Sequence, residues 1–330
     1  MKTTTKYTLL ILTVLSFLGV TFIFLITFTS PIYKNKQLTI PPNFKTVHLL
    51  DSLHNNSNFD KTMIKIVDPI IELVLRRKPY SQQVSFVKGT NFISLSVQLR
   101  TKQPINTISV SIPEGLNIKE IASIFRHKMN IDSVAFVTLC TNQQFIDSLQ
   151  ITSNSLEGYL YPNTYEFYQN SSPQVIIKRL TKEFNKMWAK YCSSVDMNDQ
   201  KAILTLASIV EAETPVISER KTVAGVYQNR INKGMKLEAD PTVQYALQSK
   251  KRLLYKDLEV DSPYNTYRYK GLPPGPINSP SISSILAAIS PENHSYLFFV
   301  ARGDNSNLHY FSSTYSQHLE SVALYRERNK

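Results

Sequence analysis

Cysteine is nearly absent from this chain. Only Cys140 and Cys192 occur among 330 residues, far apart and in no metal-ligand spacing. This excludes a disulfide-rich scaffold and offers no support for a zinc site built on cysteines. Two unpaired, buried thiols are the favoured interpretation, and a disulfide formed in an oxidising compartment is the alternative.

Glycine and charge are also scarce. The chain has 9 glycines and 19% charged residues, which argues against a low-complexity or disordered protein. The apolar content is sufficient for real cores, since 42% of the residues are hydrophobic and 16 Phe and 18 Tyr are present. A chain of this length has room for a membrane segment and two modest domains.

Acidic residues are too few to balance the basic ones, and the formal net charge is +12. The lysines and arginines are scattered, and the sequence shows no zinc-finger spacing and no aromatic RNA-binding motif, so nucleic acid is a poor candidate partner. Attraction to anionic lipid headgroups or to an anionic wall polymer fits better. A solvated basic surface without a partner is an equally acceptable interpretation.

Only one long apolar run is present. Residues 7–33 carry no charge, and residues 9–28 are almost wholly apolar, which is long enough to cross a bilayer core of about 30 Å. We expect a single transmembrane helix over residues 7–30, with residues 1–6 as a cytoplasmic tail. The alternative is a cleaved signal peptide, but the run ends in Thr27-Phe28-Thr29-Ser30-Pro31, without a small-x-small site.

The body alternates between helical and strand patterns. Residues 31 to about 58 read as a polar linker with some strand character, and residues 59–77 as a helix that Asp68-Pro69 would kink or split. Residues 92–99 fit either a helix or a strand. The remaining predicted elements are strands at 84–87, 108–112, 296–300 and 308–311, and helices at 117–129, 173–191, 201–213, 219–232, 281–289 and from 316. Residues 84–99 and 108–124 faintly echo each other.

The helix at 201–213 carries the candidate acid. Its apolar residues recur at helical spacing, and Glu211 lies at the border of that stripe, whereas Glu213 is about 200° further round. A carboxyl group beside apolar neighbours resists ionisation and can donate a proton to a glycosidic oxygen. The alternative is an ordinary glutamate that pairs with Arg220 or Arg230.

Polar and rigid segments follow this helix. Asp240-Pro241 predicts a helix cap and first turn, which gives Asp240 a structural alternative. Residues 264–267 offer an amide, a hydroxyl and two rings, which suits binding of N-acetyl and hydroxyl groups. Residues 272–277, rich in proline, could form a cleft wall.

The order of these segments and the residues in them resemble those of the endolytic murein transglycosylases (MltG/YceG-like family). The resemblance covers roughly residues 108–325. It is carried by LEGYLYPNTY (156–165), LASIVEAET (206–214), ER (219–220), NR (229–230), DPTV (240–243), YNTY (264–267), GLPPGPI (271–277) and the Gly303…His309-x-Phe311…His318 tail.

The resemblance implies an α+β fold with one transmembrane helix, a membrane-proximal region at 31–105, a LysM-like α/β module with a connecting helix at 106–195, and a catalytic domain at 196–330. A LysM-like module would bind N-acetylglucosamine polymers, with a generic packing module as the alternative. The implied protein sits in the cell membrane with its body outside, cleaves nascent glycan strands and works beside peptidoglycan synthases. It needs no metal or cofactor.

The implied reaction is lytic cleavage of the β-1,4 bond between N-acetylmuramic acid and N-acetylglucosamine. Glu211 would protonate the leaving oxygen and then deprotonate the muramoyl 6-hydroxyl, which gives a 1,6-anhydro end. Substrate binding is expected at ten positions: Asn229, Arg230, Asp240, Thr242, Tyr264, Asn265, Thr266, Tyr267, Pro273 and Pro274. Ala212, Glu238 and Leu319 depart from the family pattern, and Glu238 adds an acid near the expected cleft.

Three other classes stay open. A hydrolase would need a second carboxylate about 5–10 Å from Glu211, for which Glu238 or Asp240 is the candidate and Glu213 a poor one. A wall-binding or division scaffold would use the same module without catalysis. A metalloenzyme would have to use three histidines whose spacing matches no zinc signature, namely His294, His309 and His318.

Overall fold

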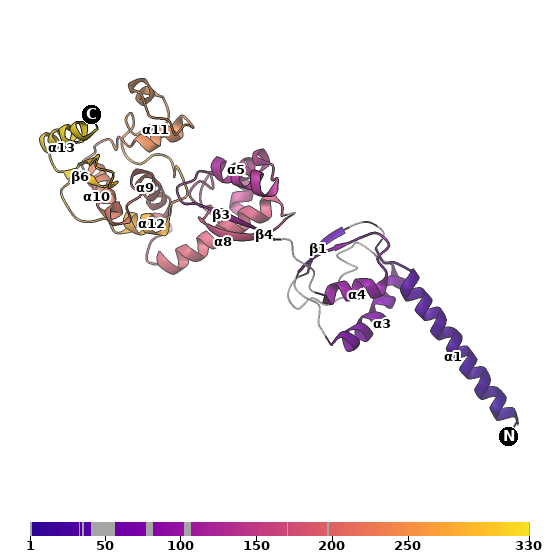
Figure 1. Ribbon diagram of the computed structural model, residues 1–330. Coiled ribbons are helices and arrows are strands. Elements are labelled where there is room, and N and C mark those ends of the chain that lie inside the picture. Colours follow the sequence, from indigo (N-terminus) through magenta and orange to yellow (C-terminus); the bar gives the residue numbers. More distant parts are fainter. Residues whose placement is uncertain are drawn as a thin grey trace. The chain divides into compact units, whose positions relative to one another are not determined.

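The computed structural model describes residues 2–32, 34, 36–40, 57–76, 82–101, 107–169, 171–196 and 198–329 (Figure 1). Contacts within the chain divide it into two compact units, Met1–Asn106 and Thr107–Lys330. The described residues form many helices and three two-stranded sheets, which confirms the α+β class. The finer domain boundaries stay a prediction, and the expected polar linker lies largely outside the described residues.

The first unit contains α1 (Lys2–Phe28), β1 (Lys36–Ile40), α3 (Asn58–Leu75), β2 (Gln82–Phe86) and α4 (Phe92–Arg100). Strands β1 and β2 pair antiparallel. The segment at 92–99 is a helix because the Asn91 side chain caps it, accepting a hydrogen bond from the Ser94 backbone at 2.8 Å. Pro69 lies inside a continuous α3, so the chain does not split there.

A buried arginine joins the two packed helices of this unit. Arg100 on α4 is 1% exposed, and its guanidinium binds both carboxylate oxygens of Asp68 on α3, at 2.6 and 2.9 Å. Glu72, one turn further along α3, accepts a third hydrogen bond at 3.2 Å. A buried cation with this many acceptors is well compensated, so the pair fixes the register of α3 against α4.

The membrane-spanning helix expected over residues 7–30 is not confirmed. Helix α1 is present over Lys2–Phe28. In the part of the chain that the structure describes, no helix is long and apolar enough to cross a membrane.

The second unit begins with two paired strands that enclose two helices and a short third one, here called the β-α-α-β module. Strand β3 (Thr107–Ile112) leads into α5 (Ile118–Met129), α6 (Ser133–Thr141) and the short α7 (Gln143–Ser148), and β4 (Asn163–Tyr168) returns antiparallel to β3. Asn117 and Glu120 form a reciprocal capping box at the start of α5. This module supports the expected α/β packing, and its LysM-like binding role stays a prediction.

The faint sequence similarity between residues 84–99 and 108–124 corresponds to similar local structure. Both α4 and α5 follow a strand, and each is capped by an asparagine that lies five residues after the strand ends, Asn91 or Asn117. A glycine with positive φ stands in each turn, Gly89 at 91° and Gly115 at 74°. Glycine adopts this left-handed backbone without strain, which lets both strands turn directly into a helix.

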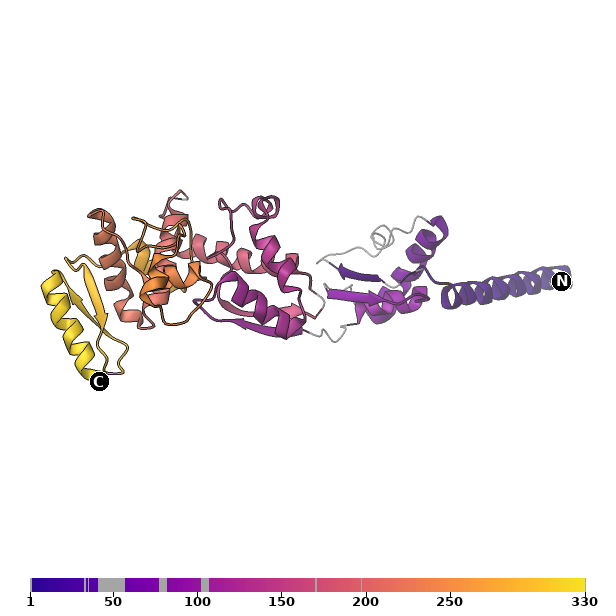
Figure 2. The ribbon, with the colours of Figure 1, turned by 90° about the horizontal axis from the view of Figure 1, so that it is seen from above.

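The rest of the second unit is mostly helical. It comprises α8 (Pro173–Tyr191), α9 (Gln200–Glu213), η2 (Ile217–Glu219), α10 (Arg220–Asn232), α11 (Asp240–Ala246), η3 (Tyr255–Glu259), α12 (Ile282–Ile289), β5 (Phe298–Ala301), β6 (His309–Ser312) and α13 (Tyr315–Arg328). Figure 2 shows α13 lying along the β5–β6 hairpin. All the helices and the hairpin expected here are confirmed, with ends shifted by a few residues.

Helix α9 lies deeper than expected. All residues from Leu204 to Val210 are buried, so the helix is covered on every side rather than along one stripe. The core around α9 is continuous with that of the β-α-α-β module, since Val110, Phe125 and Ile209 belong to one buried cluster. Cys140 and Cys192 lie in this cluster as free thiols, which confirms the favoured interpretation.

Two close backbone approaches join the module to the helical part. The Gly115 amide donates to the Ser279 carbonyl at 2.8 Å, and the Ser279 amide donates to the Leu116 carbonyl at 2.9 Å. Gly158, with φ of 85°, leaves no room for a side chain, because a Cβ there would lie 2.8 Å from the Pro276 ring. These contacts fix the turn at 113–115 beside the segment at 276–279.

Candidate active site

An open groove lies where the two parts of the second unit meet. Its volume is about 1080 Å³. One wall is the turn at 113–115 with the first half of α5, and the other is α11 with residues 248–250. Its lining also includes Glu211, Arg220 and Asn278. The groove is thus bounded by segments that are far apart in the sequence.

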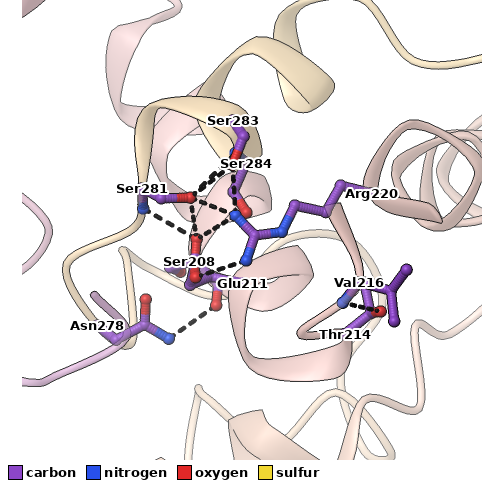
Figure 3. Close-up of polar contacts among 9 residues, drawn as sticks. All are labelled: Ser208, Glu211, Thr214, Val216, Arg220, Asn278, Ser281, Ser283 and Ser284. Carbon is purple, nitrogen blue, oxygen red and sulfur yellow. Dashed lines mark hydrogen bonds and ion pairs between the residues drawn. The ribbon is translucent and has the colours of Figure 1, made fainter. Parts of the chain in front are cut away.

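Glu211, at the end of α9, is held by a cluster of hydrogen-bond donors (Figure 3). Its Oε1 lies 3.0 Å from Nη2 of Arg220, and its Oε2 lies 3.2 Å from Nη1 of the same side chain. Ser281 donates to Oε2 from its backbone amide at 2.9 Å and from its hydroxyl at 2.5 Å. The side chains of Glu211 and Arg220 are each 7% exposed.

This arrangement differs from the apolar pocket expected for Glu211, because polar donors surround its carboxylate. The sequence left two interpretations of Glu211 open, a proton donor or a glutamate that pairs with an arginine. Pairing with Arg220 is observed, and Glu211 nevertheless lines the groove. The two oxygens are not equivalent. Within the described protein, Oε2 accepts three hydrogen bonds and Oε1 accepts one, so Oε1 is the oxygen with spare capacity to exchange a proton.

The neighbouring Glu213 plays a different role, as its helical phase predicts. It accepts a hydrogen bond from the Tyr227 hydroxyl at 2.7 Å, away from the groove. Burial raises the pKa of Glu213 to about 7, partly offset by that hydrogen bond. Among the residues that line the groove, the acids besides Glu211 are Glu114 and Glu120, and both come from the β-α-α-β module.

None of the ten residues expected to bind substrate lines this groove. Asn229 and Arg230 instead hold the segment that leads into β5. They donate to the carbonyls of His294 and Leu297 at 2.8 and 2.7 Å. Asn265 is fully buried and donates to two carbonyls of its own loop. These contacts have structural roles, and a role in binding substrate stays a prediction.

The other expected binding residues also have structural partners. Thr242 and Thr266 are buried with their hydroxyls 2.8 Å apart. Asp240 does not cap α11 through its side chain, which was expected; Ala239 is the capping position, and Asp240 accepts a hydrogen bond from Tyr267 at 2.6 Å. The Tyr264 ring packs against the Tyr245 ring at a tilt, with ring centroids 4.8 Å apart. Pro273 is buried, and Pro274 is exposed beside it.

Of the three departures from the family pattern, one lines the groove. Ala212 lies exposed in its lining. Glu238 does not line it and pairs with Arg230 at 3.2 Å, with 48% of the Glu238 side chain exposed. Leu319 lies exposed on α13. The acid expected near the cleft therefore points elsewhere.

The three histidines serve the packing of the C-terminal segment. His309 Nδ1 lies 2.8 Å from a carboxylate oxygen of Glu219, and its backbone amide donates to the other oxygen at 2.9 Å. His318 stacks on Phe298, at 5.3 Å between ring centroids, and its Nδ1 is buried without a hydrogen-bond partner among the described residues. His294 Nε2 lies 2.9 Å from the Thr222 carbonyl.

Glu157 is an important residue that the sequence patterns did not single out. It is 5% exposed and accepts hydrogen bonds from the Ile118 amide, at the start of α5, and from the Tyr245 hydroxyl of α11, both at 3.1 Å. It therefore joins the two walls of the groove. The signal was an acid in the middle of the aromatic run at 156–161.

Burial raises the pKa of Glu157 to about 8 from an ordinary 4.5, although its hydrogen bonds oppose the shift. The folded state therefore holds the proton while the unfolded state ionises. The stability that this proton provides is fully present below pH 4.5 and is lost as the pH rises to about 8. Glu213 adds a smaller effect of the same sign.

We expect Glu157→Gln to flatten the pH dependence of folding. Between pH 5 and 8 the wild-type free energy of unfolding should fall more steeply, by up to about 1.4 kcal/mol per pH unit from this group. The fluorescence of the single tryptophan, Trp188, which is buried in the second unit, reports unfolding during denaturant titrations. Equal slopes for the two proteins would refute a neutral, buried Glu157.

The fold and the groove together define a class. A carboxylate held in place by donors, on an open polar groove between a strand–turn–helix module and a helical domain, is suited to acid–base chemistry on an extended polar chain. The model of the YceG-like family matches residues 38–324. The chain belongs to this family, which confirms the resemblance seen in the sequence.

Two similar proteins are named for the same activity. The endolytic murein transglycosylase of Bacillus subtilis (strain 168) is 32% identical over 256 residues, which are 72% of this chain and 71% of that protein. That of Streptococcus pneumoniae serotype 2 (strain D39 / NCTC 7466) is 29% identical, over 65% of this chain and 44% of its own length. Both names agree with the expected enzyme class, a lytic transglycosylase.

A solved structure shows the same fold. The yceG-like protein of Listeria monocytogenes, known from a 2.6 Å crystal structure, superposes with a TM-score of 0.59 and 29% identity. The match covers 87% of this chain and 99% of that one.

Proposed function

We propose that this chain is an endolytic lytic transglycosylase of peptidoglycan. It cleaves the β-1,4 bond between N-acetylmuramic acid and N-acetylglucosamine and leaves 1,6-anhydro ends. The observation that carries the proposal is the position of Glu211, an oriented carboxylate on the wall of the groove in a chain whose named relatives are murein transglycosylases.

Glu211 acts twice in this reaction. Protonated at Oε1, it gives its proton to the glycosidic oxygen as the bond to C1 breaks. The same oxygen then takes the proton of the muramoyl 6-hydroxyl as that hydroxyl attacks C1. Arg220 and Ser281 keep Oε2 fixed throughout and stabilise the carboxylate between the two transfers. The nucleophile belongs to the substrate, so no second carboxylate is required.

The β-α-α-β module contributes to this site directly. Its turn at 113–115 and the start of α5 form one wall of the groove that contains Glu211. In this proposal the module binds the glycan strand as part of the active site rather than as a separate anchor.

Location and partners belong to the proposal as well. The enzyme would act at the outer face of the cell membrane, beside peptidoglycan synthases, on strands as they are made. Large apolar side chains of α1, among them Phe17 and Phe28, are exposed, and a lipid surface would cover them. Recovery of the chain from the soluble fraction of gently lysed cells would contradict this location.

A hydrolase is the second candidate, and the groove contains a carboxylate that could serve as its second catalytic group. Glu114 is exposed and lines the groove with Glu211, whereas the carboxylates expected for this role, Glu238 and Asp240, do not line it. With Glu114 as base, a water molecule would be added at C1.

Mass spectrometry of uncrosslinked glycan strands incubated with the purified chain tests the proposal. We expect muramoyl ends that are lighter by one water than hydrolytic ends. Reducing ends with water added would replace the transglycosylase with the hydrolase. Intact strands that pellet with the protein would instead favour a wall-binding scaffold.

A further inference from the structure

The segment at 277–281 follows the side of α9 that faces the groove. The Ile277 amide donates to the Ser208 hydroxyl at 3.0 Å, and the Ser281 amide donates to Glu211 at 2.9 Å. Between these two contacts lies Asn278, which is 4% exposed and belongs to the lining of the groove. Its position is therefore fixed from both sides.

The orientation of the Asn278 amide is also fixed. Its Nδ2 donates to the Ser208 carbonyl at 2.8 Å, a contact visible in Figure 3. The opposite orientation would place two oxygens against each other. Oδ1 must therefore point away from α9, and no donor among the described residues reaches it.

A buried acceptor without a donor is costly and is uncommon in folded proteins. Five buried side-chain atoms, donors and acceptors together, have no partner in the described part of the chain, and only Asn278 Oδ1 and the Arg220 Nε donor belong to residues that line the groove. Arg220 already uses its other nitrogens on Glu211 and the nearby serines. Among the residues that line the groove, Asn278 Oδ1 is therefore the acceptor without a partner in the described protein.

The distance between Asn278 and Glu211 suits a donor on the same sugar ring that reacts at Glu211. Asn278 binds at Ser208, and Glu211 follows three residues later, about 4.5 Å along the helix axis. In an N-acetylated sugar the C2 acetamido group is attached beside C1, whose glycosidic oxygen takes the proton. A single sugar can therefore present its reacting centre to Glu211 and its amide N–H to Asn278.

We propose that Asn278 Oδ1 accepts a hydrogen bond from the N–H of the 2-acetamido group of the sugar at Glu211 and so selects N-acetylated strands. This rests on the proposed function and names a specificity-determining residue of the same site. A strand with free amino groups would present an ammonium ion at this place.

The test is a change of specificity. Wild type, Asn278→Asp and Gln244→Glu are each given N-acetylated strands and chemically de-N-acetylated strands, and the ratio of their kcat/KM values is measured. In Asn278→Asp the hydrogen bond to the Ser208 carbonyl is lost, which should lower both rates, but a carboxylate now meets the ammonium, so the ratio of de-N-acetylated to N-acetylated cleavage should rise at least tenfold. Gln244→Glu places the same charge elsewhere on the groove lining, and we expect a change below threefold.

Each outcome decides the matter. An unchanged ratio in Asn278→Asp, or an equal rise in Gln244→Glu, overturns the role of Asn278 while cleavage by wild type leaves the proposed function intact. No cleavage by wild type removes the proposed function and this inference with it. Should Trp188 fluorescence show that Asn278→Asp is unfolded, Asn278→Ser replaces it. The expected result is then a KM for N-acetylated strands raised about fivefold, as loss of one hydrogen bond implies; wild-type values of KM and kcat overturn the inference.

Discussion

Glu211→Gln should lower kcat for glycan cleavage by about a thousandfold and abolish the anhydro products. Glutamine keeps the size of the side chain and an oxygen that can accept from Ser281, but it can neither give nor take the proton. Positioned acid–base groups contribute about 10²–10⁴-fold, and here one group serves both steps. The rate of product formation from purified strands, followed by mass spectrometry, provides the measurement.

The matched control is Glu114→Gln, which changes the exposed carboxylate in the same groove. A transglycosylase needs one carboxylate, so this variant should keep its rate within about threefold. Comparable losses in both variants would show that two carboxylates work together, as in a hydrolase. Full activity of Glu211→Gln, with folding verified by Trp188 fluorescence, would remove Glu211 from the reaction.

Periodic patterns were the most predictable part of the fold. Helix α9 and the hairpin of β5 and β6 appear where spacing of apolar residues places them, because such spacing directly reflects which face is buried. The depth of α9 was not predictable in this way. Thr205 and Ser208 look solvent-exposed in the sequence but are buried, because their hydroxyls bind carbonyls of the helix itself.

The candidate site was predictable only in part. Glu211 stood out because it borders the apolar stripe of its own helix, which is local information. Ser281 and Asn278 reach α9 from about seventy residues further along, and the turn at 113–115 reaches it from about a hundred residues before. Such contacts arise from tertiary packing, which one sequence does not encode in any short pattern.

Residues that looked suited to binding sugar were misleading for a physical reason. Amides and hydroxyls satisfy backbone groups in irregular loops as readily as they bind ligands. Asn265 caps its own loop and Asn229 holds the end of the segment before β5, so both amides are already occupied. Asn278 has the same chemistry, but one of its atoms has no partner in the described protein, and only the structure could reveal that.

Arg220→Leu is expected to destabilise the second unit by about 3–5 kcal/mol. The change removes the guanidinium but leaves the Glu211 carboxylate 7% exposed, with Ser281 as the one remaining donor among the described residues. Breaking a buried pair from one side has a cost of this size because the remaining charge is already desolvated. Denaturant titrations followed by Trp188 fluorescence measure the change.

A second variant separates the charge from the packing. Adding Glu211→Gln to Arg220→Leu removes the uncompensated carboxylate, so the double variant should be more stable than the sum of the two single losses predicts, by about 1–3 kcal/mol. Strictly additive losses would mean that the two side chains do not stabilise each other and that Arg220 contributes only through its packing. Arg220→Lys should fall between wild type and Arg220→Leu, because an ammonium retains the charge but cannot bind both oxygens of Glu211 in the paired geometry that the guanidinium provides.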